Sequence, residues 1–355
     1  MNKFWEVVVN SQGTNRFYCF PFLLLFRILT PIYQYFSRKN LLNRKNRCSR
    51  EWKAKVISIG NITVGGSGKT PLILRLAKRF ISMGKKVVIV HSGYGRTSKE
   101  DVIIPYNSKD EYTVNSIGDE TAMMRVKLPQ AGFAIGRDKK NILKRADREL
   151  APDVVLIDDG YQRLDIEKDI DIALISPEIL ETNPDSRQKK RLRLFPSGIL
   201  REPMKALSRA DALFLFDFKE NANEKEVFGK RVYHWRLAFE GISQNGKVIS
   251  DDEREKIRPY LFTGIGSFDR MQAMIENYEI TVMGAHNFGD HYSYNKLDFE
   301  MLRDLRIESK ADSYLTTAKD LVKLPSEGLD KPVYCLELGV HPVDEGSINR
   351  LFGWE

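Results

Sequence analysis

A glycine-rich segment that ends in Lys69 and Thr70 is the part of this sequence best suited to chemistry. It comprises residues 65–70, Gly-Gly-Ser-Gly-Lys-Thr, and lies between an apolar run at 56–59 and a helical pattern at 71–80. A strand that leads through such a turn into a helix directs several backbone N–H groups at one point, where they bind phosphate. In this pattern the lysine reaches the β- and γ-phosphates, and the threonine hydroxyl ligates Mg²⁺. The segment therefore predicts a binding site for a nucleoside triphosphate.

The start of this loop departs at one position from the usual pattern. Thr63 stands five residues before Gly68, where the pattern has glycine. Because that position shapes only the start of the loop, we favour the nucleotide site over a glycine-rich turn without a ligand. The residues predicted to contact the nucleotide are Thr63, Val64, Gly65, Gly66, Ser67, Gly68, Lys69 and Thr70.

Two carboxylates end a second apolar run. Residues 154–157 read as a buried strand, and Asp158 and Asp159 follow directly. Such a turn alone is often only structural, but an enzyme with a phosphate-binding loop needs carboxylates to hold or orient Mg²⁺. We therefore predict that both aspartates, with Thr70, position the metal ion.

A further acidic pair and the histidines have less specific surroundings. Asp119 and Glu120 precede a helical pattern at 121–128, where acids usually cap the helix, and this stays the default interpretation. His291 lies in a polar loop, so it is either incidental or an aid to proton transfer. The other histidines with no motif around them are assigned structural roles: His91, His234 and His341.

The positive charge is concentrated at the N-terminal end. The chain has 355 residues and a net charge of +8, but residues 1–55 carry eleven Lys and Arg against two acids. The remainder is close to neutral, which argues against nucleic acid as a partner and favours an anionic membrane surface. No obligate protein partner is inferred. The three cysteines have no disulfide or metal-ligand spacing, which indicates a reducing cytoplasm.

The same end contains the most apolar stretch, residues 17–36. Arg27 and two prolines interrupt it, so we expect an interfacial helix rather than one that crosses the bilayer. The basic tract at 38–55 would then lie on anionic lipid. The alternative is a helix packed on the protein's own core. No small-residue cleavage site follows, so a removable signal peptide is not expected.

Apolar runs that alternate with helical patterns predict an α/β fold. We expect a mostly parallel sheet with flanking helices, of the P-loop NTPase type, with ligands at the carboxyl ends of the strands. The predicted strands are 55–59, 86–91, 132–135, 154–157, 170–175 and 212–216.

The pattern changes near residue 231 and predicts a second, smaller α/β domain. Residues 231–237 alternate, and Asn245-Gly246 is a strong hairpin signal, so a two-stranded linker is expected there. Short strands are then predicted at 260–262, 280–283, 314–315 and 333–336. The predicted divisions are a membrane-associated N-terminal helix with its basic segment (1–50), a P-loop core (51–230), a linker (231–255) and a C-terminal α/β domain (256–355).

Motifs along nearly the whole chain resemble those of one enzyme family. They are residues 60–71, 93–96, 118–120, 158–162, 196–203, 262–266, 290–292 and 316–320. In this order they are far more specific than the loop alone, and the chain resembles the tetraacyldisaccharide 4'-kinases of the lipid A pathway in Gram-negative bacteria. Thr63 is also typical of that family. The resemblance implies transfer of phosphate from ATP, with Mg²⁺, to the 4'-hydroxyl of a tetraacylated glucosamine disaccharide 1-phosphate at the cytoplasmic face of the inner membrane.

The resemblance also implies roles for individual residues. Asp119 would be the catalytic base, with His291 tuning or orienting its carboxylate. Lys69 would bind phosphate, and Gln162 would lie near the nucleotide and metal. Further contacts to the disaccharide or the transferred phosphate would come from Tyr94, Arg96, Arg137, Arg201 and Glu202. Such roles suit phosphoryl transfer, which depends on positioning and charge neutralisation.

Two features of the sequence qualify this picture. The family usually has Ser-Arg-Gly-Tyr where residues 91–94 read His-Ser-Gly-Tyr, so Ser92 replaces an arginine. If that arginine contacts substrate or nucleotide, another cation must replace it. The basic run within 187–193 is best explained as a solvated loop, with contact to lipid headgroups or to the substrate's 1-phosphate as the alternative.

The sequence leaves two other functions open. One is a membrane-recruited P-loop ATPase or GTPase that acts as a switch or chaperone without a lipid acceptor. The other is a nonenzymatic membrane-binding module whose nucleotide loop is vestigial, for which Lys69→Ala would change nothing beyond stability.

Overall fold

The structure, a computed structural model, describes residues 15–64, 68–180, 192–216, 226–266, 268–278, 280–290, 292–325 and 328–354. The chain forms two compact units. Unit 1 comprises Met1–Lys69, Lys139–Arg236 and Pro342–Glu355, and unit 2 comprises Thr70–Asp138 and Leu237–His341. The sequence divisions predicted at residues 50, 230 and 255 stay a prediction.

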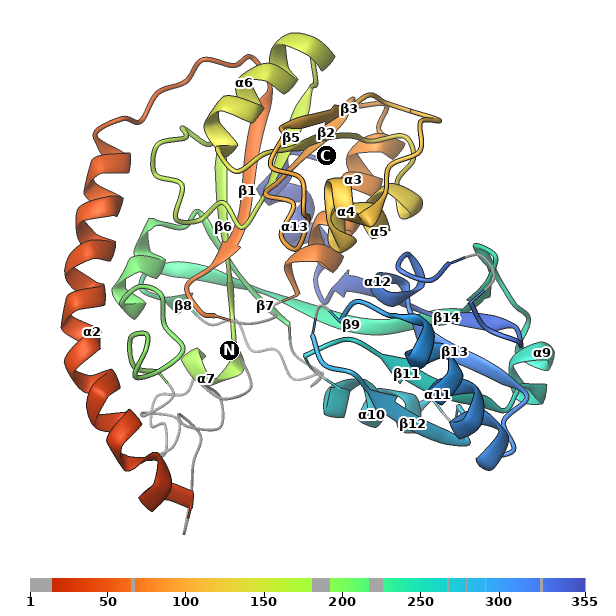
Figure 1. The fold of residues 1–355 in the computed structure, drawn as a ribbon. Coiled ribbons are helices and arrows are strands. Elements are labelled where there is room, and N and C mark those ends of the chain that lie inside the picture. Colours follow the sequence, from red (N-terminus) through yellow and green to blue (C-terminus); the bar gives the residue numbers. More distant parts are fainter. Residues whose placement is uncertain are drawn as a thin grey trace. The chain divides into compact units, whose positions relative to one another are not determined.

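Unit 1 is built on a parallel sheet in which β1 (Lys55–Asn61) leads toward the phosphate-binding loop. β1 pairs with β5 (Val154–Asp158) on one side and with β6 (Ile170–Ile175) on the other (Figure 1). Beyond β6 lie β7 (Ala212–Phe216) and the first part of β9 (Lys230–Gln244), both also parallel. β1, β5, β6 and β7 are almost entirely buried, as expected for strands of a parallel sheet that is covered on both faces.

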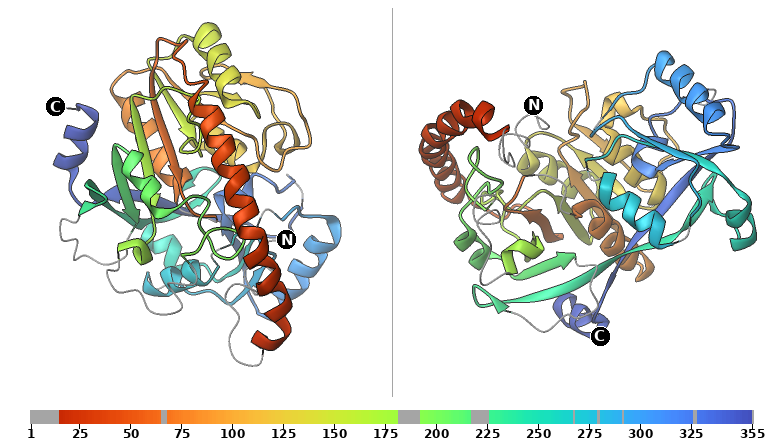
Figure 2. Two further views of the ribbon diagram at one scale, coloured as in Figure 1. Left: turned by 90° about the vertical axis from the view of Figure 1, so that its left-hand side faces the viewer. Right: turned by 90° about the horizontal axis from the view of Figure 1, so that it is seen from below.

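Helices of unit 1 surround this sheet. They are α2 (Asn15–Lys45), α6 (Lys139–Leu150), α7 (Pro177–Leu180), the 3₁₀ helix η1 (Met204–Arg209) and α13 (Glu345–Phe352), with a short strand β8 (Glu226–Val227) on β9. Figure 2 shows α2 as a long red helix at the side of the unit. Thr30 Oγ1 lies 2.7 Å from Ser197 Oγ, and the rings of Tyr33 and Phe195 meet edge to face at 5.3 Å. One side of α2 is therefore attached to the loop around residue 197.

The first part of unit 2 carries the helix that follows the phosphate-binding loop. That helix, α3 (Lys69–Ser82), begins with the last residue of unit 1 and buries apolar side chains at helical spacing, from Leu72 to Phe80. The strands here are β2 (Val87–His91) and β4 (Gly132–Ile135), which are parallel, and β3 (Val102–Ile104), which is antiparallel to β4. Two helices, α4 (Val114–Ile117) and α5 (Asp119–Lys127), precede β4.

The second part of unit 2 contains four neighbouring parallel strands. The order is β12 (Gly284–Asn287), β11 (Pro259–Thr263), β13 (Ser313–Thr317) and β14 (Val333–Pro342), followed by β9. Its helices are α9 (Asp251–Lys256), α10 (Phe268–Asn277), α11 (Lys296–Glu308) and α12 (Ala318–Leu321). The predicted hairpin is confirmed: β10 (Lys247–Val248) pairs with β9 across Asn245 and Gly246, whose φ angles are +50° and +77°.

Some predicted boundaries were wrong. Residues 280–283 are not a strand, because Ile280 ends the turn after α10 and buries its side chain in the core, and the strand that pairs with β11 begins at Gly284. The helix expected at 17–36 extends over Asn15–Lys45. Among the helices that the structure describes, none is long and apolar enough to cross a membrane.

Candidate active site

The phosphate-binding loop closes on Gly68 and Lys69 in unit 1. Gly65, Gly66 and Ser67 lie outside the residues that the structure describes. Gly68 has a φ of +79°, and a Cβ there would come within 2.7 Å of the Phe216 ring, so this position requires glycine. Lys69 is the first residue of α3, and its Nζ lies 3.5 Å from Asn61 Oδ1 and 3.6 Å from Asp159 Oδ1. The lysine is thus held over the ends of β1 and β5.

The start of the loop is fixed by a neighbouring segment. The Thr63 side chain is buried and accepts a hydrogen bond from Asn61 Nδ2 at 3.1 Å. Val64 N donates to the carbonyl of Ile199 at 2.8 Å, and Arg201 N donates to that of Ile62 at 2.7 Å. The start of the loop is therefore hydrogen-bonded to the segment around Arg201, which is predicted to contact the substrate.

Asp158 and Asp159 end β5 as predicted, and a buried lysine supports them. Asp159 has a positive φ of +48°, and Lys139 Nζ donates to the carbonyls of Asp158 at 2.6 Å and of Asp159 at 2.9 Å. Burial lowers the pKa of Lys139, and the charges of Asp159 and Asp158 offset this effect only in part. Nothing in the local sequence marked Lys139 as the support of a turn about twenty positions away.

The Asp159 carboxylate lies among cations. Arg201 Nη1 is 3.0 Å from Asp159 Oδ2, and Lys69 faces the other oxygen. Burial raises the pKa of Asp159, but the charges of Lys69, Arg201 and Lys139 outweigh it and lower that pKa from 3.8 to about 2. A concentration of cations around a loop that binds triphosphate is what phosphoryl transfer requires.

The oxygen donors that the sequence predicts as metal ligands are of the type that suits Mg²⁺. The two carboxylates and the Thr70 hydroxyl are hard oxygen ligands, which is the donor type that Mg²⁺ takes when it bridges protein and phosphate. The proposed metal ligands are therefore Thr70, Asp158 and Asp159.

A hydrogen bond links Gln162 to Glu202, which is buried. Gln162 Nε2 donates to the Asn61 carbonyl at 2.9 Å and to Glu202 Oε1 at 3.0 Å. Arg209 holds both oxygens of Glu202, at 2.7 and 3.0 Å, and Glu202 is only 3% exposed. Both carboxylate oxygens of Glu202 thus have protein partners, and its contact with substrate stays a prediction.

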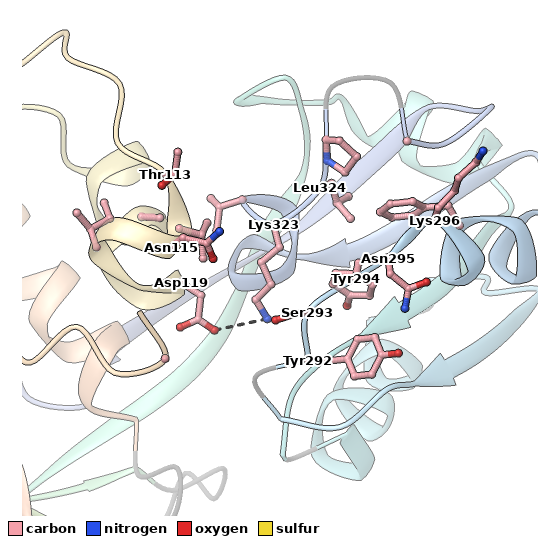
Figure 3. A pocket seen from close by; sticks show the side chains of 18 of the residues that line it. Thr113, Asn115, Asp119, Tyr292, Ser293, Tyr294, Asn295, Lys296, Lys323 and Leu324 are labelled. Atoms are coloured by element: carbon pink, nitrogen blue, oxygen red, sulfur yellow. Dashed lines mark ion pairs between the residues drawn. The ribbon is translucent and has the colours of Figure 1, made fainter. Parts of the chain in front are cut away.

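In unit 2, Asp119 is the first residue of α5 and is nearly buried, at 5% exposure. Its Oδ1 accepts the backbone N–H of Glu120 at 2.9 Å, but the N-cap residue of α5 is Gly118, so Asp119 lies in the first turn of the helix without capping it. Its Oδ2 faces two lysines, Lys323 Nζ at 3.5 Å and Lys319 Nζ at 3.9 Å (Figure 3). His291 lies outside the described residues, so its pairing with Asp119 stays a prediction.

His91, which the sequence interpretation left as structural, lies beside the same acidic pair. It is 2% exposed and ends β2; its Nδ1 accepts the N–H of Gly93 at 2.8 Å, and its Nε2 lies 3.3 Å from Glu120 Oε2. Since Nδ1 is an acceptor, we assign the Nε2–H tautomer, which donates to Glu120. The position of His91 just before the motif at 93–96 was the available signal.

Lys319, within the motif at 316–320, joins three carboxylates. Its Nζ lies 3.0 Å from Asp290 Oδ1, 3.8 Å from Glu120 Oε1 and 3.9 Å from Asp119 Oδ2. Burial lowers the pKa of Lys319, but the carboxylates outweigh it and raise that pKa. Three motifs that are distant in sequence therefore meet at one ammonium group.

A cavity of about 1030 Å³ opens beside Asp119 within unit 2. Figure 3 shows Asp119 and Thr113 on one side and Lys323, Tyr294 and Tyr292 on the other. The cavity gives Asp119 a route to molecules from solvent.

The remaining predicted substrate contacts also lie in unit 2. Tyr94 is 65% exposed, and Arg137 is exposed too. Arg96 donates to the carbonyl of Glu100 at 2.6 Å, and burial lowers its pKa, as does the charge of Arg137. Tyr94 and Arg137 are thus accessible, whereas part of the Arg96 guanidinium is bonded to the protein.

The fold and the site together define a class of protein. A parallel α/β sheet that presents a phosphate-binding loop, a lysine, and carboxylates at the carboxyl ends of its strands is a P-loop nucleotide-dependent enzyme.

Comparisons with known proteins narrow this class to one family. A family model described as LpxK, tetraacyldisaccharide-1-P 4'-kinase, matches residues 17–352. The tetraacyldisaccharide 4'-kinase of Rickettsia canadensis (strain McKiel) is 33% identical over 289 residues, which cover 80% of this chain and 80% of that protein. The enzyme of the same name from Aquifex aeolicus (strain VF5) is 31% identical over 297 residues, with 83% and 86% covered.

A solved structure agrees with these matches. The crystal structure of the apo form of LpxK from Aquifex aeolicus, in complex with ATP, superposes with a TM-score of 0.73 at 28% identity and covers 96% of this chain and 99% of that one. The chain belongs to the tetraacyldisaccharide-1-P 4'-kinase family. The resemblance seen in the motifs and the predicted fold class are both confirmed.

Proposed function

We propose that this protein transfers the γ-phosphoryl group of ATP to the 4'-hydroxyl of a tetraacylated glucosamine disaccharide 1-phosphate, a lipid A precursor. Membership of the family makes it a kinase of this kind, with ATP and Mg²⁺ as its cofactors. The observation that carries the proposal is the family match over residues 17–352, because it includes the loop, both acidic pairs and the second α/β sheet.

In unit 1, the residues around the loop would bind and neutralise the triphosphate. Lys69 and the loop amides would contact the phosphates, and Arg201 lies close enough to Asp159 to add a second cation at this site. Bound Mg²⁺, held by Thr70, Asp158 and Asp159, would neutralise charge on the phosphate oxygens. Lys139 would keep the acidic turn in place.

In unit 2, Asp119 would act as the catalytic base. The 4'-oxygen forms a bond to the γ-phosphorus while the bond to the β–γ bridging oxygen breaks and ADP departs. The hydroxyl proton passes to the Asp119 carboxylate. His291 would orient that carboxylate, and Tyr94, Arg96, Arg137, Arg201 and Glu202 stay proposed contacts to the acceptor or the transferred phosphate.

We further propose that α2 lies on the cytoplasmic face of an anionic bilayer. Several of its apolar side chains are exposed, and its last turn carries Arg44 and Lys45. These exposed side chains are Leu25, Ile28, Leu29, Ile32, Tyr35, Phe36 and Leu42. Because Thr30 and Tyr33 contact the loop around residue 197 of unit 1, the helix has both an attached side and an exposed apolar surface, as interfacial helices do.

A groove beside α2 suits the lipid part of the acceptor. Its volume is about 570 Å³, and it lies between α2 and the segment around Leu194 and Met204. Arg27 and Arg193 line it and would face lipid phosphate. Arg193 is the one member of the predicted basic run in the described part of the chain; residues 187–191 lie outside it.

The direct test is incubation of detergent-solubilised protein with γ-labelled ATP, Mg²⁺ and the tetraacyl disaccharide 1-phosphate. We expect label in the lipid. Lipid-independent hydrolysis with no labelled lipid would instead favour the ATPase or GTPase switch. An Arg193→Glu variant that leaves both liposome binding and substrate affinity unchanged would remove the role of the basic run.

A further inference from the structure

Lys323 forms an ion pair with the proposed base. It follows α12, its side chain is 7% exposed, and its Nζ lies 3.5 Å from Asp119 Oδ2 and 3.2 Å from Asp320 Oδ1 (Figure 3). The ammonium group also stands over the Tyr294 ring, 5.9 Å from its centroid. No sequence motif singled out this lysine, because its partner Asp119 is about two hundred positions away.

Lys323 is itself fixed by a rigid anchor. Asp320 is fully buried and accepts the N–H of Gly264 at 3.0 Å and the hydroxyl of Thr317 at 2.8 Å. These two partners lie at the ends of β11 and β13. A continuous set of contacts therefore runs from two strand ends through Asp320 and Lys323 to the Asp119 carboxylate.

We propose that Lys323 is a positioning residue for Asp119, which aims its carboxylate at the cavity and keeps it ionised. The inference rests on the proposed function, in which Asp119 is the base. A carboxylate with 5% exposure is costly to keep charged unless a cation faces it. Lys323 provides that cation from a fixed point of the fold.

The other charged groups near Asp119 make this role specific. Lys319 is shared by three carboxylates and lies closest to Asp290, so Lys323 is the shorter contact to Asp119. The other groups nearby do not supply a positive charge. Three of them are carboxylates, Glu120, Asp290 and Asp320, and the His91 imidazole, which donates to Glu120, is neutral in the assigned tautomer. Without Lys323, these acids would favour protonation of the base.

The test is the pH dependence of kcat for lipid phosphorylation in Lys323→Met and Lys323→Arg. In Lys323→Met we expect the acid limb of the pH profile to move up by about one to two pH units, so that kcat falls about tenfold one unit below the new midpoint and recovers at high pH. The KM for ATP should stay within about twofold. Lys323→Arg, which keeps the charge, should restore most of the wild-type profile.

Lys127→Met is the matched control. Lys127 lies near the end of α5, about 12 Å along the helix from Asp119, and pairs with Glu337 at 2.8 Å. This variant also loses a half-buried ion pair, but its acid limb should not move.

Several outcomes would overturn the inference. If Lys323→Met lowers kcat equally at every pH, the lysine is only structural. If Lys323→Met does not fold, Lys323→Gln must show the same shift, and an unmoved limb there rejects the role. Asp119→Asn distinguishes failure of the proposed base from failure of the positioning role. Full activity in Asp119→Asn would show that Asp119 is not the base. An inactive Asp119→Asn, together with an unmoved acid limb in Lys323→Met, would reject only the positioning role of Lys323.

Discussion

Gly118 sets the direction from which the proposed base enters its site, and replacing it is a demanding test of the geometry. Gly118 precedes α5 with φ of +87° and ψ of 154°, a conformation that side chains rarely adopt. A Cβ at this position would lie 2.9 Å from the carbonyl oxygen of Tyr94 and 3.3 Å from the carbonyl carbon of Gly93. Both neighbours are backbone atoms, so no side chain can rotate away.

The cost of Gly118→Ala follows from these two effects. The backbone conformation costs about 1 to 3 kcal/mol for a residue with a Cβ, and the close contact adds about 1 to 2 kcal/mol. We therefore expect a loss of roughly 2 to 5 kcal/mol, or about 5 to 15 °C in Tm for a cooperative unit of about 150 to 250 residues. A shift of about 1 Å at Asp119 would lower kcat by about a hundredfold.

The assays are thermal unfolding and lipid phosphorylation, with Gly84→Ala as the control. Gly84 also has a positive φ, +75°, but a Cβ there meets no atom within 4 Å. That variant should lose only about 1 kcal/mol and keep its kcat. A Gly118→Ala protein with the Tm and kcat of Gly84→Ala would contradict the close approach of α5 to the segment at 93–94.

Three further predictions follow. Lys69→Ala and Asp119→Ala should each cut phosphate transfer by at least about a hundredfold, and ATP-binding measurements should show that only Lys69→Ala weakens nucleotide binding. Arg201→Gln should lower the free energy of unfolding by about 0.5 to 1 kcal/mol near pH 7, since Asp159 is partly exposed and keeps two other cations. Because the pKa of Asp159 is about 2 in the folded protein against 3.8 without its partners, this difference should persist above about pH 4 and vanish as the pH falls toward 2, whereas a difference that grows in acid would contradict the assignment. Ile28→Glu combined with Phe36→Glu should reduce sedimentation with anionic liposomes at least about tenfold without changing ATP binding, and unchanged sedimentation would favour a helix that serves only the protein's own core.

The sheets could be predicted because their strands carry a local signal. Strands such as Gly132–Ile135 and Ile170–Ile175 are apolar runs buried on both faces, and they appear within the predicted bounds. The turn at Asn245-Gly246 requires positive φ angles at both residues, and Asn and Gly are the residue types that adopt them most readily. The prediction of a strand at 280–283 was wrong because an apolar residue that is buried in a turn, such as Ile280, cannot be distinguished from a strand residue by its type alone.

The site was only partly predictable for a different reason. The loop, Asp119, Asp158 and Asp159 belong to motifs with a local pattern, so their positions could be read along the chain. Lys139 and Lys323 carry no such pattern, because each is defined by carbonyl or carboxylate partners that folding brings from elsewhere. The contact of His91 with Glu120 could not be predicted either, because it depends on where folding places the end of β2 and the start of α5.

The decisive measurement is phosphate transfer from labelled ATP to the lipid acceptor, with the labelled position identified on the sugar. If the protein is the 4'-kinase proposed here, label is expected at the 4' position of the tetraacyl disaccharide in amounts equal to the ADP formed. Label that remains in ATP or appears only as inorganic phosphate, with the lipid unmodified, would contradict it.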